Sequence, residues 1–139
     1  MTQLRVREAA LFLGVSEDTV RRRVEKGALE AGTDAAGRMV LDGAEVARLA
    51  RDLAVAPDVP GTASSARNRF VGLVTDVVMD TVMAQVELQC GPFRVVSLMS
   101  SEAARELELA PGAVATASVK ATQVVIEAAP VARTDGDRP

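Results

Sequence analysis

The chain has 139 residues and a formal net charge of −3, and its composition of 48% hydrophobic and 25% charged residues is typical of a globular protein. It has no His and only one cysteine, Cys90, which excludes imidazole metal ligands, histidine-based catalysis, an internal disulfide framework and a CxxC metal site. We therefore predict that the protein is not an enzyme and carries no cofactor.

Two features argue against a membrane or secreted protein. The longest run without a charge covers residues 109–119, whereas a membrane-spanning helix needs about 20 apolar residues. Glu8 interrupts any signal-peptide core at the N-terminus. We predict a cytoplasmic protein with no membrane partner.

Composition divides the chain into four segments. Residues 1–54 hold nine basic and nine acidic side chains and are interpreted as one small domain. Residues 55–64 belong to a Pro, Gly and Ser/Thr-rich stretch that predicts a linker. Residues 65–129 are rich in Val and predict a second domain, and residues 130–139 predict a disordered tail.

The first domain begins with two predicted helices. The first helix has an apolar face at helical spacing, formed by Val6, Ala9, Ala10 and Leu13. Gly14 ends this helix, Ser16 caps a second one, and Gly27 stops that second helix after about Lys26. Two short helices joined in this way predict a helix-turn-helix unit.

A hairpin and a third helix complete this domain. Residues 29–41 predict a small hairpin, or wing, that turns at residues 34–37. Asp42 is a cap for a third helix, and Glu45 stands three residues later, as in a capping box. The apolar face of this helix is predicted to contain Val46, Leu49 and Leu53.

The second helix has a face that suits DNA. At about 100° per residue, Val20 and Val24 point to one side, which we assign to the core. The candidate DNA contacts are Thr19, Arg22, Arg23 and Lys26 on this helix and Arg38 on the wing. The alternative is a solvated surface, in which Glu17 pairs with Arg21 and Asp18 with Arg22.

A resemblance to a known family favours DNA binding over a solvated surface. The stretch VREAALFLGVSEDTVRRRVEKGAL, the hairpin with Arg38 and the stretch DGAEVARLA resemble excisionase/MerR-like winged helix-turn-helix domains over residues 4–54. The resemblance implies binding to double-stranded DNA, with a recognition helix at residues 16–26. Arg5 stands where these domains usually have a Thr or Ser cap. Because the segment has no net charge, a dimer is needed to bind DNA well.

The sequence of the second domain predicts short strands with one helix. Strands are predicted at residues 70–79, 82–89, 93–99, 113–120 and 123–127, with a helix at 102–107 between the third and fourth. We therefore predict an α+β protein with an N-terminal winged helix-turn-helix and a C-terminal five-stranded OB-like barrel. A barrel by itself names no ligand.

Three short motifs in this domain resemble those of a second known family. SARN at residues 65–68, LAPG at 109–112 and KAT at 120–122 resemble the molybdate-binding Mop domains of the TOBE class. The resemblance implies a site for a tetrahedral oxyanion, molybdate or tungstate, built from Ser65, Arg67, Asn68, Ser100, Lys120 and the backbone N–H of Ala121. Ala103 stands where the family has a second hydroxyl, so that contact is lost or is replaced by Ser101.

The chemistry of this set suits an oxyanion. Molybdate offers only acceptor oxygens, and hydroxyl, guanidinium, ammonium and backbone N–H groups are donors. Each residue also has a purely structural alternative: Ser65 as a turn residue, Arg67 and Lys120 as solvated strand ends, and Ser100 as a helix cap.

Together, the two resemblances imply a molybdate- or tungstate-responsive DNA-binding transcription regulator. The alternative is a molybdate storage protein whose N-terminal domain recruits another protein. We expect a homo-oligomer, a dimer or a hexamer, because a barrel of about 65 residues is small for a stable core of its own. In the resembling family the sites are shared between subunits, which implies Ser65 and Arg67 from one chain and Lys120 with Ser100 from another.

Overall fold

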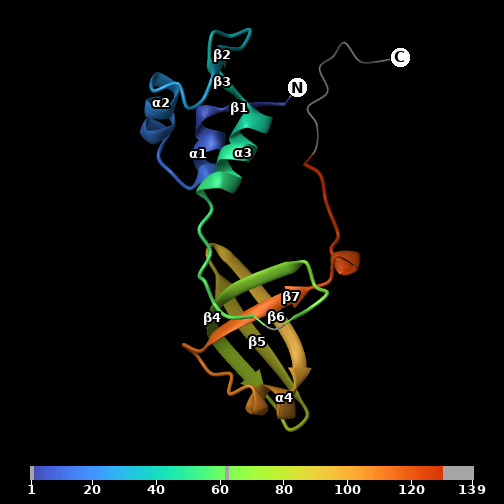
Figure 1. Ribbon diagram of the computed structural model, residues 1–139. Helices are drawn as coiled ribbons and strands as arrows, with labels where there is room; N and C mark the ends of the chain where they lie inside the picture. Colours follow the sequence, from blue (N-terminus) through green and yellow to red (C-terminus); the bar gives the residue numbers. More distant parts are fainter. Residues whose placement is uncertain (1, 62, 130–139) are drawn as a thin grey trace, which may run out of the picture. The chain divides into compact units, whose positions relative to one another are not determined.

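The computed structural model describes residues 2–61 and 63–129 and divides into two compact units, with the boundary between Ala56 and Pro57 (Figure 1). The predicted tail at 130–139 lies outside the described residues. The mixture of helices and antiparallel sheets confirms the predicted α+β class.

The N-terminal unit has three helices and a three-stranded sheet. In chain order its elements are β1 (Gln3–Arg5), α1 (Val6–Leu13), α2 (Glu17–Glu25), β2 (Ala31–Thr33), β3 (Met39–Asp42) and α3 (Gly43–Leu53). The sheet order is β1-β3-β2, with both pairs antiparallel. The two predicted helices, the hairpin and the third helix are therefore present.

The helix ends of this unit follow from local chemistry. Gly14 ends α1 at φ 67°, a left-handed conformation that favours glycine. The Ser16 hydroxyl accepts the backbone N–H of Thr19 at 3.1 Å and caps α2. At the start of α1, the Glu8 carboxylate accepts the backbone N–H of Arg5 at 2.9 Å, which makes up for the missing Ser or Thr cap.

The core of the N-terminal unit lies between its helices and β3. Its buried residues are Val6, Ala9, Ala10, Val20, Leu29, Leu41 and Val46. Val24 and Leu49 are half-buried against this cluster, as the helical spacing predicts. Leu53 remains 38% exposed, so the last turn of α3 lies beyond the core.

Two local predictions for this unit were incomplete or wrong. Strand β1 was not predicted, because three residues with one apolar side chain give no periodic signal. Asp42 caps α3 by accepting the backbone N–H of Ala44 at 3.1 Å. Glu45 does not complete a capping box, because its carboxylate accepts the backbone N–H of Glu30 at 3.2 Å and so ties α3 to the start of the hairpin.

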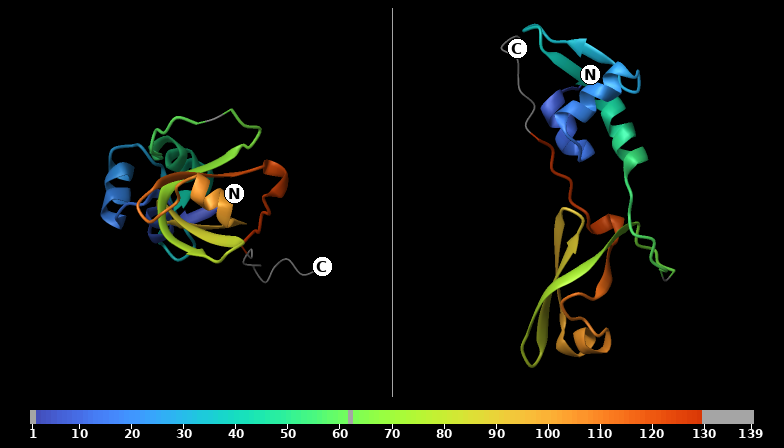
Figure 2. Two further views of the ribbon diagram at one scale, coloured as in Figure 1. Left: turned by 90° about the horizontal axis from the view of Figure 1, so that it is seen from below. Right: turned by 90° about the vertical axis from the view of Figure 1, so that its left-hand side faces the viewer.

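The C-terminal unit is a curled antiparallel sheet of OB-like form with one helix (Figure 2). Its elements are β4 (Asn68–Met79), β5 (Met83–Cys90), β6 (Phe93–Ser100), α4 (Ser101–Glu106), β7 (Val114–Val119) and a 3-10 turn at Ala121–Gln123. The strand order is β6-β5-β4-β7. Ala84, Val86 and Leu88 on β5 are buried, as the period-two alternation predicts.

The predicted fifth strand of the barrel is wrong. Residues 123–127 form no strand, because the chain leaves β7 through the 3-10 turn and does not return to a sheet edge. Val124, Val125 and Ile126 are 41%, 83% and 85% exposed. The sheet therefore has four strands. A hollow of about 300 Å³ is lined by residues of β5, β6 and β7 and by Leu107 and Leu109.

No helix among the described residues is long and apolar enough to cross a membrane. The same residues contain no cluster of three or more Cys, Asp or Glu side chains that could hold a metal ion.

Candidate functional site

Five of the six predicted oxyanion residues belong to one end of the sheet, where β4 begins and β7 ends. Asn68 pairs with Val119 in the β4–β7 ladder, and its side-chain amide donates to the Val119 carbonyl at 3.1 Å. Arg67 and Lys120 come directly beyond this last pair. The half-buried Asn68 therefore joins the SARN and KAT segments, and we name this region the SARN–KAT end (residues 65–68 and 120–122).

The cations at this end are available to an anion. Arg67 and Lys120 are exposed, and within residues 2–61 and 63–129 neither has a carboxylate within 4.0 Å. Ser65 is also exposed, in a bend that precedes β4. Ala121 is the first residue of the 3-10 turn, where a backbone N–H has no acceptor within the turn itself.

Ser100 lies at the other end of the sheet. It ends β6 and pairs with Met83, next to the turn that follows β4. Its hydroxyl oxygen caps α4 by accepting the backbone N–H of Ala103 at 3.1 Å. The cap uses a lone pair, so the hydroxyl hydrogen can still be donated to a ligand.

Ser101 is not a replacement for the missing hydroxyl at Ala103. Its side chain is fully buried, and its hydroxyl donates to the Asp80 carbonyl at 2.7 Å. Its backbone N–H donates to the Val82 carbonyl at 2.8 Å. Ser101 therefore holds the β4–β5 turn and has no free donor for a ligand.

A negative charge lies near the Ser100 end. The Asp80 carboxylate accepts backbone N–H groups from Met83 at 2.7 Å and Val82 at 2.8 Å. These bonds, that of Met83 first, lower the pKa of Asp80 below its ordinary value of 3.8, so the carboxylate stays ionised at neutral pH. The N–H groups of the β4–β5 turn already bind this carboxylate.

The strand ladders place the predicted set at two ends of β4. Lys120 is at the SARN–KAT end with Arg67, and Ser100 is at the opposite end of β4. The expected sharing of the site between subunits stays a prediction.

The candidate DNA contacts on α2 differ in their exposure and in their hydrogen bonds. Arg22 and Lys26 are exposed. Thr19 is half-buried, and its hydroxyl shares a hydrogen bond with that of Ser16 at 2.9 Å. Arg23 is half-buried, and its Nε is buried without a hydrogen-bond partner in the described part of the chain.

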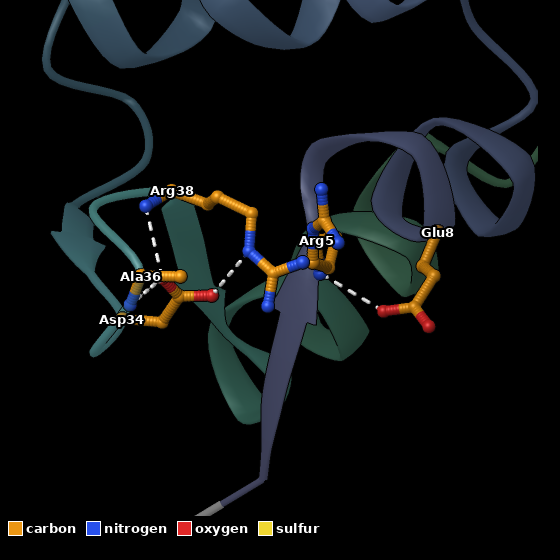
Figure 3. A network of polar contacts seen from close by, with 5 residues as sticks. All are labelled: Arg5, Glu8, Asp34, Ala36 and Arg38. Carbon is orange, nitrogen blue, oxygen red and sulfur yellow. Dashed lines mark hydrogen bonds and ion pairs between the residues drawn. The ribbon is translucent and has the colours of Figure 1, made fainter.

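Arg38 on the wing is held in place by the hairpin turn. Its Nε donates to the Asp34 carboxylate at 2.9 Å (Figure 3). The backbone N–H of Arg38, and after it the Arg38 side chain, lower the pKa of Asp34. Arg38 is thus oriented, but its charge is partly neutralised.

The solvated-surface alternative predicted ion pairs on α2. Among the described residues, neither Glu17 with Arg21 nor Asp18 with Arg22 comes within 4.0 Å. Arg21 instead lines a hollow with Arg5, Arg7 and Arg38. This hollow was not predicted, because a helical wheel of α2 does not show where the start of α1 and the wing lie.

Comparisons with known proteins agree with the C-terminal motifs. Residues 64–126 match the family described as TOBE domain. A molybdate-binding protein from Sporomusa ovata is 30% identical, covers 48% of this chain and 100% of its own, and has a TM-score of 0.46. MopII from Clostridium pasteurianum is 37% identical, with the same coverage and a TM-score of 0.44.

A third solved structure is the cytoplasmic molybdate-binding protein ModG with molybdate bound. It is 39% identical to this chain, covers 44% of each chain and has a TM-score of 0.42. A search of curated proteins gives no match.

Proposed function

Because this chain belongs to the TOBE domain family through residues 64–126, we propose that its C-terminal unit binds molybdate or the similar oxyanion tungstate. The observation that carries the proposal is the SARN–KAT end, where Arg67 and Lys120 are exposed and unpaired within the described residues. The relatives at 30–39% identity, which are named as molybdate-binding proteins or as MopII, support it.

The residues suit a dianion with only acceptor oxygens. Arg67 offers a planar fork of N–H donors, and Lys120 offers a compact positive charge. The Ser65 hydroxyl and the Ala121 N–H add neutral donors. The proposal includes no chemical step, so these residues bind the anion and transform nothing.

The proposal includes self-association, as a dimer or a hexamer. Both outer strands of the sheet, β6 and β7, have an edge that pairs with no other described strand. Val125 and Ile126 expose more than four-fifths of their surface directly after the KAT motif. An unpaired edge and a nearby apolar segment favour strand addition from a second copy. Such a contact can also bring Ser100 of one chain to the SARN–KAT end of another.

The N-terminal unit favours a regulator that binds double-stranded DNA. We interpret α1, α2 and the β2–β3 hairpin as a winged helix-turn-helix, with α2 as the recognition helix. Arg22 and Lys26 are exposed on α2, and the ion pairs of the solvated-surface alternative are not formed in the described residues. Molybdate would then change how paired N-terminal units are presented to DNA, in the cytoplasm.

A molybdate store is the second candidate, and the comparisons fit it at least as well. The Sporomusa ovata protein and MopII are covered over 100% of their length by less than half of this chain, so those proteins have no segment that corresponds to the N-terminal unit. A store would use the N-terminal unit for protein recruitment.

Calorimetry tests the proposed ligand. The wild-type protein is titrated with molybdate, tungstate, sulfate and phosphate, and we expect heats for the first two and none for phosphate. Lys120→Gln and Arg67→Gln should each weaken molybdate binding at least tenfold, since hydrogen bonds to charged groups contribute about 1.5–3 kcal/mol. Arg94→Gln, whose ion pair with Glu87 is exposed, is the matched control. Equal heats for sulfate and molybdate would contradict a dedicated molybdate site.

DNA footprinting separates the regulator from the store. A regulator protects a defined sequence, and molybdate changes that protection. A store shows no sequence preference on duplex DNA and binds molybdate all the same.

A further inference from the structure

A hollow of about 420 Å³ in the N-terminal unit is lined by four arginines. They are Arg5 and Arg7 at the start of α1, Arg21 on α2, and Arg38 on the wing. Two carboxylates, Glu8 and Glu17, also line it. We name this region the arginine groove (Arg5, Arg7, Arg21 and Arg38).

The arginine groove has one formal positive charge in excess, because Glu8 and Glu17 line it and Asp34 binds Arg38. One Glu8 oxygen accepts the backbone N–H of Arg5, so this carboxylate is used to cap α1 (Figure 3). Within residues 2–61 and 63–129, Arg5, Arg7 and Arg21 have no carboxylate oxygen within 4.0 Å. Three of the four lining arginines therefore have no ion-pair partner among the described residues.

Arg38 extends the same surface. Its Nε is bound to Asp34, and Figure 3 shows the rest of its guanidinium reaching toward Arg5. The bond to Asp34 fixes the side chain and leaves the terminal N–H groups available. The arginine groove thus joins three elements, the start of α1, the first half of α2 and the wing.

The chemistry favours phosphate groups. A guanidinium fork matches phosphate oxygens in a bidentate geometry. The hollow is far larger than a site for one tetrahedral anion, since one water molecule occupies only about 30 Å³. An extended polyanion with successive charges fits four arginines on three elements better than a single small ion does.

We propose that the arginine groove holds the sugar–phosphate backbone of duplex DNA, beside the face of α2 that carries Arg22 and Lys26. This inference rests on the proposed DNA binding and adds Arg5, Arg7 and Arg21 to the contact surface. Phosphate contacts position a protein on the duplex but do not read sequence. The arginine groove therefore supplies affinity, and Arg22 and Lys26 remain the candidates for base contacts.

The test is a salt titration of binding to a mixed-sequence duplex DNA by gel shift, with the full chain. Arg7→Gln and Arg21→Gln should each weaken binding and reduce the slope of log affinity against log salt by about 0.9, the value for one lost phosphate contact. The same reduction is expected on an unrelated duplex. Arg51→Gln is the matched control, because Arg51 is exposed on α3 and does not line the hollow. Thermal unfolding checks that each variant folds.

The outcomes distinguish the groove proposal from the proposed DNA binding. If Arg22→Gln lowers the slope and Arg7→Gln and Arg21→Gln do not, the groove proposal is wrong and DNA binding stands. If the wild type binds no duplex even at low salt, both are wrong. If the groove variants lose binding to inorganic phosphate or to polyglutamate instead of DNA, the groove is a small-anion site or a site for an acidic protein, which also overturns the proposal.

Discussion

A single hydroxyl at Ser100 can serve two partners. Its oxygen accepts the Ala103 N–H and caps α4, while its hydrogen remains free. The structural and the ligand-binding interpretations of Ser100 are therefore compatible, and substitution can separate them.

We predict that Ser100→Asp keeps the cap and loses molybdate binding. Asp is as good an N-cap as Ser, so the melting temperature should stay near that of the wild type. The carboxylate has no hydrogen to donate at neutral pH and repels a dianion. Ser100→Ala, in contrast, should also destabilise the protein by about 1 kcal/mol. Wild-type affinity in Ser100→Asp would remove Ser100 from the site.

Gly72 on β4 is a position where no side chain fits. A Cβ there would lie 2.6 Å from Cys90 Sγ and still closer to the Gln89 carbonyl oxygen. We predict that Gly72→Ala lowers the free energy of unfolding of the C-terminal unit by about 1–3 kcal/mol, the usual cost of overpacking. Gly32→Ala is the control, because its Cβ would only contact Val40 Cγ2 at 3.8 Å. Urea denaturation measures both, and equal stabilities would contradict the prediction.

At the scale of elements, the β4–β5 turn depends on an ionised carboxylate. Asp80 accepts two backbone N–H groups, and its pKa is lowered in the folded state. A group of this kind stabilises the fold above its unfolded pKa, and the contribution is lost as pH falls from about 3.8 through the folded pKa.

We therefore predict that the melting temperature of Asp80→Asn is lower than that of the wild type at neutral pH and falls less steeply below about pH 4. Asp76→Asn is the control, because Asp76 accepts no side-chain hydrogen bond in the described residues. Melting curves between neutral and acid pH measure the difference. Parallel curves for Asp80→Asn and the wild type would show that the turn does not need the charge.

Most elements could be predicted because their signals are local. Gly14, Ser16 and Asp42 mark helix ends by their own chemistry, and alternation on β5 marks a half-buried strand. The errors have non-local causes. The Glu45 carboxylate accepts the N–H of Glu30, which is distant in sequence. Residues 123–127 have strand propensity, but the 3-10 turn after β7 leads them away from the sheet.

In the candidate sites, too, local motifs could be predicted and the arrangement that depends on distant segments could not. The motifs identified Arg67 and Lys120, and the register of β4 with β7 brings their segments together. The separation of Ser100 from Lys120 depends on strand order, which no motif encodes. The hollow lined by Arg21 could not be predicted, because its other arginines, Arg5, Arg7 and Arg38, come from other parts of the unit.

At the scale of the whole molecule, the segment after the KAT motif tests self-association. Val125 is 83% exposed in the single chain, so Val125→Asp should change the stability of a monomer by less than about 0.5 kcal/mol. If a second copy covers this segment, the buried carboxylate should instead prevent assembly. Light scattering with and without molybdate measures this, and Val55→Asp, at a residue that is 95% exposed, is the control. A wild type that stays monomeric under both conditions would contradict the prediction.

The position of residues 124–126 has a consequence for measurements of affinity. Only Gln123 separates the KAT motif from these three apolar residues, so a contact that orders the segment also fixes Lys120 and Ala121. Ligand binding and subunit association are then linked by mass action. The apparent dissociation constant for molybdate should rise as the protein is diluted, and a cell would tune its response to the anion through the amount of this protein that it makes.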